Sequence, residues 1–178
     1  TGSPISMKDT PVSFKAIGKG LMGPVPILII IAAIFTIIFA ILMNKSTVFR
    51  KAYYVGSNEQ AAEFSGINVS RVKLGVYILS AVFAGLGGIM TVSRFSVASA
   101  NAGRGLEMTA ISACVIGGSS MNGGTGTIIG SILGLMLLTF INNALVLLSV
   151  DVYWQDMISG CILLLAVLID YFSHRTKK

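Results

Sequence analysis

A glycine-rich stretch, Gly117 to Thr127, comes nearer than any other part of the sequence to a motif with known chemistry. Its letters are GGSSMNGGTGT, between the apolar runs ISACVI and IIGSILGLMLL. A nucleotide-binding P-loop has the spacing G-x-x-x-x-G-K-[ST], in which the lysine contacts phosphate. Counted from Gly118, the lysine position is Gly124, so the cation that would offset phosphate charge is missing. The stretch instead predicts a flexible turn, or a surface for close backbone packing that includes Gly117, Gly118, Gly123, Gly124 and Gly126.

The sequence also contains no group of residues typical of a catalytic site. It shows no nucleophile–base pair, no metal-ligand spacing and no paired carboxylates. An enzyme working inside a membrane would need reactive groups that face one cavity, and Asp170 and Cys161 have suitable chemistry. They lie too far apart on one expected helix to act together. We therefore expect no enzymatic activity and no cofactor or metal on this chain.

The composition indicates a membrane protein. Of 178 residues, 54% are hydrophobic and only 11% are charged, and the mean hydropathy is +0.83. A soluble domain carries about 25% charged residues. In a membrane chain, a net charge of +6 is typical of cytoplasmic loops and does not indicate a nucleic-acid partner. Cys114 and Cys161 both lie in apolar runs, which favours packing over a disulfide.

Four apolar runs are long enough, or nearly so, to cross a bilayer, and three of them are uncharged. About 20 apolar residues cross the hydrocarbon core as a helix. The predicted spans are residues 24–43, 74–92, 127–150 and 157–172, with a broken or re-entrant element at 106–121. Residues 1–22 are polar and interrupted by glycine and proline, which predicts an external loop or interfacial segment. The predicted fold is an all-α polytopic helical bundle over residues 23–178, with about four full spans.

Orientation follows from the basic loops. The connector 44–73 contains five basic residues and two acidic ones: Lys45, Arg50, Lys51, Arg71 and Lys73, against Glu59 and Glu63. Basic loops remain in the cytoplasm, so we place the connector and the basic tail there and the turn DVYWQD outside. The chain then closes only if 106–121 returns to the cytoplasmic side, sheltered by protein. The alternative is that 106–116 stays outside and another predicted span is wrong.

The connector contains a short predicted helix. In VGSNEQAAEFSGINVSRVK, Ser57 followed by Gln60 has the spacing of a capping box, and Gly66 is a typical C-terminal stop. The expected helix has about two turns, a length that is marginal in water unless it packs on something. It either docks on a partner or lies on its own domain.

The same segment carries a family resemblance. YYVGSNEQAAEFSGINVSRVKLGVY resembles the G-x-N-x-x-A-A-x-x-S-G-I-x-V segment of sugar-type ABC importer permeases, the ribose-permease-like family. The resemblance extends to ANAGRGLEMTAISACVIGGSSMNGGTGTIIGSILG, to NNALVLL, to YWQDMISGCILLLAVLID and to the initial TGSP. These motifs match the C-terminal half of such a permease.

The resemblance implies a multi-pass subunit of the bacterial inner membrane that imports a sugar or sugar-like solute by alternating access. Its implied partners are an ABC ATPase subunit, a second permease subunit, an extracytoplasmic solute-binding protein and membrane lipid. ATP would be hydrolysed on the ATPase. The implied contacts with that subunit are Asn58, Glu59, Ala61, Ala62, Ser65, Gly66 and Ile67. A permease of a related amino-acid or nucleoside importer, or a structural membrane subunit without a pathway, remains the alternative.

A solute pathway needs polar groups inside the membrane, and the sequence offers few. Asn142 and Asn143 lie within the span 127–150, where polar side chains either serve function or bond helices together. Arg104 and Glu107 lie at the outer edge of the broken element. A pathway mouth, a salt bridge, a docking point for a solute-binding protein and simple solvated charges all remain open for this pair.

Overall fold

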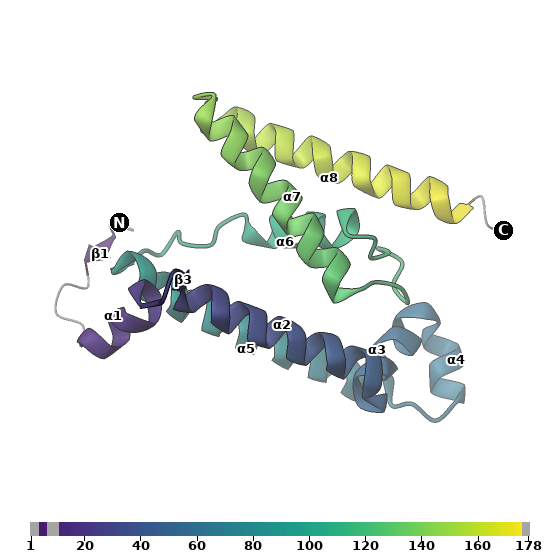
Figure 1. Cartoon of the computed structure of the whole chain (residues 1–178). Helices are drawn as coiled ribbons and strands as arrows, with labels where there is room; N and C mark the ends of the chain where they lie inside the picture. The colour runs from purple at the N-terminus through teal and green to yellow at the C-terminus, as the bar shows by residue number, and fades with distance from the viewer. Residues whose placement is uncertain (1–3, 7–10, 176–178) are drawn as a thin grey trace. The chain divides into compact units, whose positions relative to one another are not determined.

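A computed structural model of the chain describes residues 4–6 and 11–175 (Figure 1). The described residues form eight helices and four two-residue strands. The chain divides into two units, each built from two segments. Unit 1 comprises Thr1–Lys45 and Asn68–Arg104, and unit 2 comprises Ser46–Ile67 and Gly105–Lys178. The middle of the connector therefore belongs structurally with the C-terminal part of the chain.

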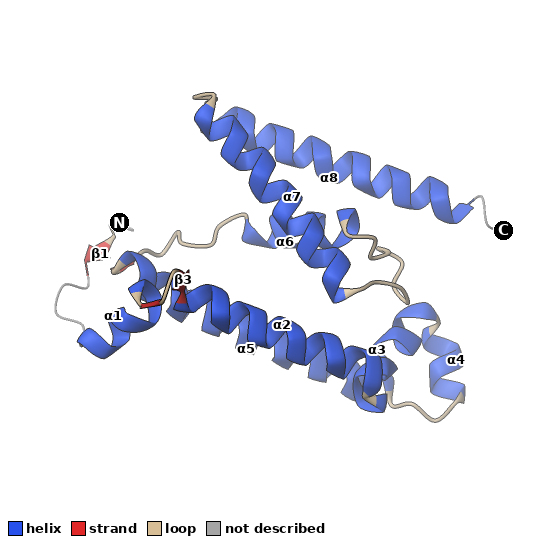
Figure 2. Ribbon diagram, viewed as in Figure 1, coloured by secondary structure: helices blue, strands red, loops and turns tan. Residues whose placement is uncertain are grey.

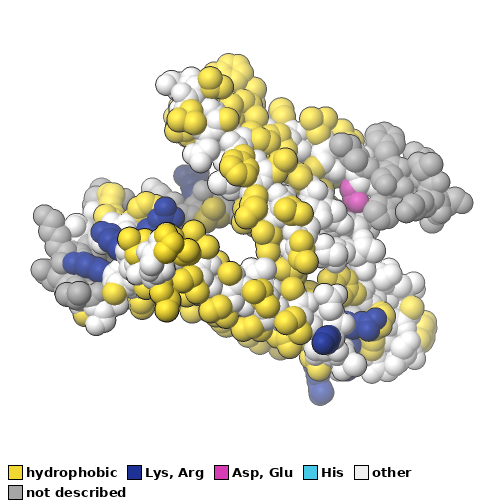
Figure 3. Space-filling model, viewed as in Figure 1, with side chains coloured by type: hydrophobic (Ala, Val, Ile, Leu, Met, Phe, Trp, Pro, Cys, Tyr) yellow, Lys and Arg dark blue, Asp and Glu magenta, His cyan; other side chains and the backbone are white. Residues whose placement is uncertain are grey.

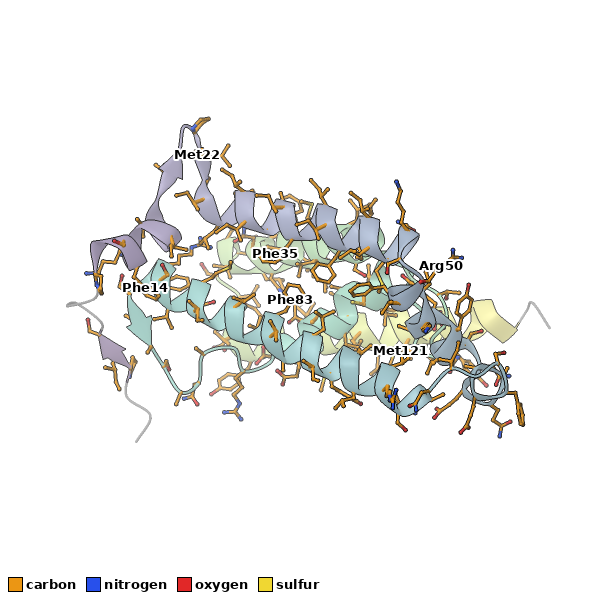
Figure 4. The ribbon with its side chains drawn as sticks, turned by 90° about the horizontal axis from the view of Figure 1, so that it is seen from below. Phe14, Met22, Phe35, Arg50, Phe83 and Met121 are labelled. Carbon is orange, nitrogen blue, oxygen red and sulfur yellow. The ribbon has the colours of Figure 1, made fainter. Side chains whose placement is uncertain are left out.

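Two long apolar helices form most of unit 1, α2 (Ile27–Lys45) and α5 (Val69–Phe95). The ring of Phe83 on α5 meets those of Phe35 and Phe39 on α2 edge to face, with centroids 5.6 and 4.9 Å apart. Figure 4 shows Phe35 and Phe83 directed toward one another. The visible side of α2 is an almost continuous hydrophobic surface with basic side chains toward both ends (Figure 3). Such a surface suits lipid and not water.

The described residues of segment 1–22, predicted as an external loop or interfacial segment, include regular structure. It contains helix α1 (Val12–Lys19) and strand β1 (Ile5–Ser6), which pairs antiparallel with β4 (Val97–Ala98). A small hairpin of β2 (Leu21–Met22) and β3 (Val25–Pro26) leads into α2.

Packing against the end of α5 explains why α1 is helical despite its polar sequence. Gly18 lies directly against the backbone of Ser93 and Arg94, where a side chain could not fit. The Ser93 hydroxyl donates a hydrogen bond to the Phe14 carbonyl, and Ser93 is only 1% exposed. Local polarity does not reveal these tertiary contacts, and the segment 1–22, predicted as an external loop or interfacial segment, contains a helix at α1.

Unit 2 contains α3 (Thr47–Ser57), α4 (Glu59–Phe64), α6 (Leu106–Ile116), α7 (Ile128–Leu147) and α8 (Val152–Arg175). Helix α6 packs against both α7 and α8, and α3 packs against α4. Among the residues of this unit whose burial the structure describes, few hydrophobic side chains are buried: Val55, Ala62, Ala113, Val115 and Leu138. A core this small is typical of a bundle whose remaining surfaces face lipid or other protein.

Helices α2, α5 and α7 are long and apolar enough to cross a membrane, and Leu106–Ile116 and Val152–Leu168 are shorter apolar helical stretches. The chain is thus a polytopic helical membrane protein. Helix α6 has 11 residues. At 1.5 Å per residue it rises roughly 16 Å, about half of a hydrocarbon core of some 30 Å. The predicted broken element 106–121 is a short helix followed by an irregular loop, drawn in tan between α6 and α7 in Figure 2.

Candidate functional site

Helix α4 is the short helix that the sequence predicts in the connector, with a different N-cap. Its cap is Asn58, whose side-chain oxygen accepts a hydrogen bond of 2.9 Å from the Ala61 amide. The predicted cap, Ser57, is the last residue of α3. The proposed capping box is therefore wrong by one residue, because the Asn58 side chain reaches the first-turn amide instead.

The C-terminal stop at Gly66 is confirmed. Gly66 has φ +79°, the left-handed conformation that glycine adopts without a steric penalty. Its amide donates to the Glu63 carbonyl at 2.9 Å, and the Ile67 amide donates to the Ala62 carbonyl at 3.0 Å. This pair of bonds is a Schellman motif, which satisfies carbonyl groups that the end of a helix leaves free. Caps at both ends hold six residues in a helix that would not persist alone.

Helix α4 has one buried position and a broad exposed surface. Ala62 is only 4% exposed, whereas Phe64 is 93% exposed. Glu59, Gln60, Ala61, Glu63, Ser65 and Gly66 are exposed as well, and Ile67 is half-buried. A large aromatic side chain projecting from a fixed helix is typical of an anchor for another protein. Phe64 is not among the contact residues that the resemblance implies, and its exposure makes it a further candidate.

Helix α3, which lies within the predicted loop 44–73, joins α4 to the rest of unit 2. Val55 is buried, while Arg50 and Lys51 are exposed. The Tyr53 hydroxyl donates a hydrogen bond of 3.0 Å to the carbonyl of Gly126. The C-terminal end of α3 therefore lies against the glycine-rich stretch, which we call the glycine loop (residues 117–127).

The glycine loop meets α3 backbone to backbone. A Cβ placed on Gly56 would lie 2.9 Å from the Gly124 nitrogen, and one on Gly124 would lie 2.8 Å from the Ser57 Cα. Gly123 and Gly124 have φ of +86° and +78°. The predicted close packing is thus present at Gly123 and Gly124, and its partner is the end of α3. Gly118 has φ +87° and open space around it, which fits a turn.

At the other end of the loop, small residues let α6 and α7 cross closely. A Cβ on Gly117 would collide with the backbone of Gly130, and one on Gly134 with that of Ala113. Gly134 is buried. The spacings A-x-x-x-G at 113–117 and G-x-x-x-G at 130–134 are the sequence signal for such a crossing, which was not among the predicted contacts.

Asp170 on α8 is hydrogen-bonded to the glycine loop. Its carboxylate oxygen Oδ2 accepts hydrogen bonds from the Ser120 hydroxyl at 3.3 Å and from the Met121 amide at 3.2 Å. Cys161 is an exposed free cysteine. The carboxylate thus connects α8 to the loop.

The four candidate pathway residues have separate environments. Asn142 accepts a hydrogen bond of 3.4 Å from the Ser159 hydroxyl on α8, which joins the two helices. Asn143, Glu107 and Arg104 are exposed. Because α7 ends at Leu147, both asparagines lie in its last turns and not deep in the span. No hydrogen bond in the described part of the chain joins any two of the four.

A family model described as "Branched-chain amino acid transport system / permease component" matches residues 2–167. The chain belongs to this permease family. Among its relatives, the ribose import permease protein RbsC of Bacillus subtilis (strain 168) is 37% identical over 95% of this chain and 52% of the relative. The galactose/methyl galactoside import permease protein MglC of Haemophilus influenzae is 37% identical, over 99% of this chain and 53% of the relative.

The ribose import permease protein RbsC of Escherichia coli (strain K12) is 39% identical, over 95% of this chain and 53% of the relative. The chain spans about half the length of the curated relatives it matches. No solved structure shows a significant match. As a member of this permease family with several apolar helices, the chain is a multi-pass protein of the bacterial inner membrane.

Proposed function

We propose that the chain forms part of the permease subunit of an ATP-binding-cassette importer and moves a sugar or sugar-like solute across the inner membrane by alternating access. Helix α4 docks on the ATPase subunit, which hydrolyses ATP. The observation that carries this proposal is α4 itself: it is fixed at both ends, lies between two apolar helices in the chain, and projects a 93% exposed Phe64. Permease relatives named for ribose and galactose import support the substrate class.

The chemistry of the glycine loop supports ATP hydrolysis on a partner. Gly124 occupies the position where a P-loop has lysine. The space beside Gly124 is occupied by Ser57 and Gly56. A loop that packs its backbone against a helix at this position cannot wrap a phosphate chain there. The movement that drives transport is then supplied by a partner subunit, and α4 offers the surface on which that subunit docks.

The contact between α3 and the glycine loop also supports the proposed topology. Gly56 and Gly124 lie side by side, so the loop after α6 is on the same side as the connector. This agrees with a return of segment 106–121 to the cytoplasm. Helix α1 packs at Ser93, near the last turn of α5, whereas α4 precedes the first turn. Residues 1–22 then belong on the external side.

The solute class is argued from the relatives and from the polar groups of α7. The family description names branched-chain amino acids, which favours an amino-acid importer as the second candidate. An amino acid carries an ammonium and a carboxylate that need charged or strongly polar partners. The candidate groups within α7 are the neutral amides of Asn142 and Asn143, which suit the hydroxyl groups of a sugar. Uptake assays with labelled pentoses, hexoses and branched-chain amino acids decide between them.

The remaining partners of this proposal follow from importer architecture. The chain works beside the other half of its permease, a second permease subunit and an extracytoplasmic solute-binding protein. Arg104 is exposed in the segment between α5 and α6, and Glu107 is exposed in the first turn of α6, an end that the proposed topology places outside. They are available to a solute-binding protein at that face.

The test is copurification of the cognate ATPase with the full-length permease. Phe64→Ala removes the proposed anchor and is expected to lower the amount of bound ATPase at least tenfold, because hot-spot truncations cost about 2 kcal/mol or more. Gly66→Pro removes the amide that closes the Schellman motif and is expected to have the same effect. Phe140→Ala is the matched control, since Phe140 on α7 is 73% exposed. Wild-type ATPase recovery with both α4 variants contradicts the proposal.

A further inference from the structure

The glycine loop is attached to α3 on one side and to α7 and α8 on the other. Both sets of contacts resist deformation. On one side it meets α3. Gly56 and Gly124 touch through backbone atoms, and Gly123 lies against the Gly56 carbonyl. No side-chain rotation can loosen a contact between two backbones. The loop must therefore follow any displacement of the end of α3.

A second attachment on the same side fixes the angle between α3 and the loop. Tyr53 precedes Gly56 by three residues and therefore lies on the same face of α3, one turn away. Its hydroxyl donates to the Gly126 carbonyl at 3.0 Å. Contacts at two points along α3 prevent the helix from pivoting about either one. Helix α4 follows Ser57 through the Asn58 cap, so its displacement is carried by the same contacts.

On the opposite side the loop is attached to the helices that follow it. Asp170 on α8 accepts from the Ser120 hydroxyl and the Met121 amide. At the root of the loop, the backbone of Gly117 packs on that of Gly130 at the start of α7. The loop therefore contacts α3, α7 and α8 directly and continues covalently into α6 and α7.

Internal hydrogen bonds keep the loop from stretching between these attachments. The Ser120 amide donates to the Thr125 carbonyl at 3.1 Å, and the Gly123 amide donates to the Ser120 carbonyl at 3.1 Å. The Asn122 amide donates to the Ser120 hydroxyl oxygen at 3.3 Å. Ser120 is thus bonded both within the loop and to Asp170. A displacement that enters at Gly123–Gly124 reaches Asp170 through a closed turn.

From this arrangement we infer that the glycine loop transmits the movement of α3 and α4 to α6, α7 and α8, and that Tyr53 and Asp170 are positioning residues for the transport cycle. The inference rests on the proposed docking of an ATPase at α4. The contacts that carry this movement are contiguous and lie within unit 2. They connect the docking helix α4 to apolar helices of the bundle. The switching element is the rigid group of helices that the loop holds together.

The experiment separates docking from transmission. The full-length permease is reconstituted with its cognate ATPase and solute-binding protein in proteoliposomes. Three quantities are measured: bound ATPase, ATP hydrolysis, and solute taken up per ATP hydrolysed. Tyr53→Phe removes a single hydroxyl oxygen and leaves the ring in place. We expect ATPase binding to stay at the wild-type level and solute uptake per ATP to fall at least threefold.

Tyr54→Phe is the matched control, because Tyr54 is the neighbouring residue and is 52% exposed. It should leave the ratio of uptake to hydrolysis unchanged. At the second attachment, Asp170→Asn keeps one oxygen acceptor but removes the carboxylate charge that strengthens both loop hydrogen bonds, and it should lower the ratio as Tyr53→Phe does. Asp156→Asn, an exposed position near the opposite end of α8, is its control.

Each outcome decides one of the two claims. Loss of ATPase binding with Phe64→Ala tests docking only. An unchanged ratio with Tyr53→Phe or Asp170→Asn, or an equal fall with Tyr54→Phe or Asp156→Asn, overturns the transmission role while docking stands. Loss of ATPase binding with Tyr53→Phe also overturns it, because the hydroxyl would then maintain the docking surface and not its connection to the bundle.

Discussion

The crossing of α6 and α7 yields a quantitative prediction from a single methyl group. Gly134→Ala places a Cβ against the Ala113 carbonyl and 2.9 Å from the Gly117 nitrogen, so the two helices must separate. Gly160→Ala is the same substitution on α8, with no atom within 4 Å of the added Cβ. Both glycines lie inside helices, where alanine is favoured by about 1 kcal/mol.

The two variants should therefore change stability in opposite directions. For Gly160→Ala only the helix term applies, which gives a gain of up to about 1 kcal/mol. For Gly134→Ala the overpacking penalty of about 1–3 kcal/mol opposes that gain. The net change runs from near zero to a loss of about 2 kcal/mol, and the variants differ by about 1–3 kcal/mol. Backbone atoms receive the added methyl, so we expect the upper part of that range.

The assay is the apparent melting temperature of the full-length permease in detergent, from the monodisperse fraction that survives heating. Both variants are heated at the same rate, because irreversible unfolding makes such temperatures depend on scan rate. Gly160→Ala should melt at or above the wild-type temperature and Gly134→Ala several degrees below it. If Gly134→Ala melts no lower than Gly160→Ala, the backbone contact between α6 and α7 is refuted.

Three further predictions follow from separate features. Asn58→Ala removes the cap on the Ala61 amide at a cost of about 1 kcal/mol, so ATPase copurification should fall about fivefold. Asn58→Ser should restore it. Equal ATPase recovery with Asn58→Ala and the wild type counts against the cap. Asn142→Leu removes the hydrogen bond with Ser159 and should cost about 0.6 kcal/mol of stability, measured by melting, whereas Asn143→Leu should not. A larger loss of stability with Asn143→Leu than with Asn142→Leu would be evidence against bonding between α7 and α8. Cysteines at Lys51 or Lys73 should react in whole cells only with a membrane-permeant reagent, and labelling by an impermeant one would invert the proposed topology.

Hydropathy and local turn chemistry were sufficient for much of the fold. Uncharged runs predicted α2, α5 and α7, since a spanning helix is defined by length and composition alone. The stop at Gly66 was predictable because a left-handed residue after a helix strongly favours glycine. The cap was misplaced because Ser57 and Asn58 are both good capping residues, and sequence alone does not show that α3 extends through Ser57.

Contacts between distant residues were not predictable in the same way. The bonds of Asp170 to Ser120 and Met121 span 50 and 49 positions, and that of Tyr53 to Gly126 spans 73. Helix α3 has too few apolar residues for a hydropathy window, and only its packing against α4 and the glycine loop shows its role. The small-residue spacings at 113–117 and 130–134 are present in the sequence, but spacing alone does not show which helices cross there.

The contact of α1 with the end of α5 constrains the order of events during biosynthesis. Phe14 and Ser93 are 79 positions apart, so the ribosome must synthesise α2, the connector and nearly all of α5 before the Ser93 hydroxyl exists to receive α1. Until then α1, with Gly18 uncovered, is a nascent segment without its binding surface. Synthesis of α5 is therefore the step that allows α1 to pack, and a nascent chain arrested before Ser93 should leave α1 open to protease.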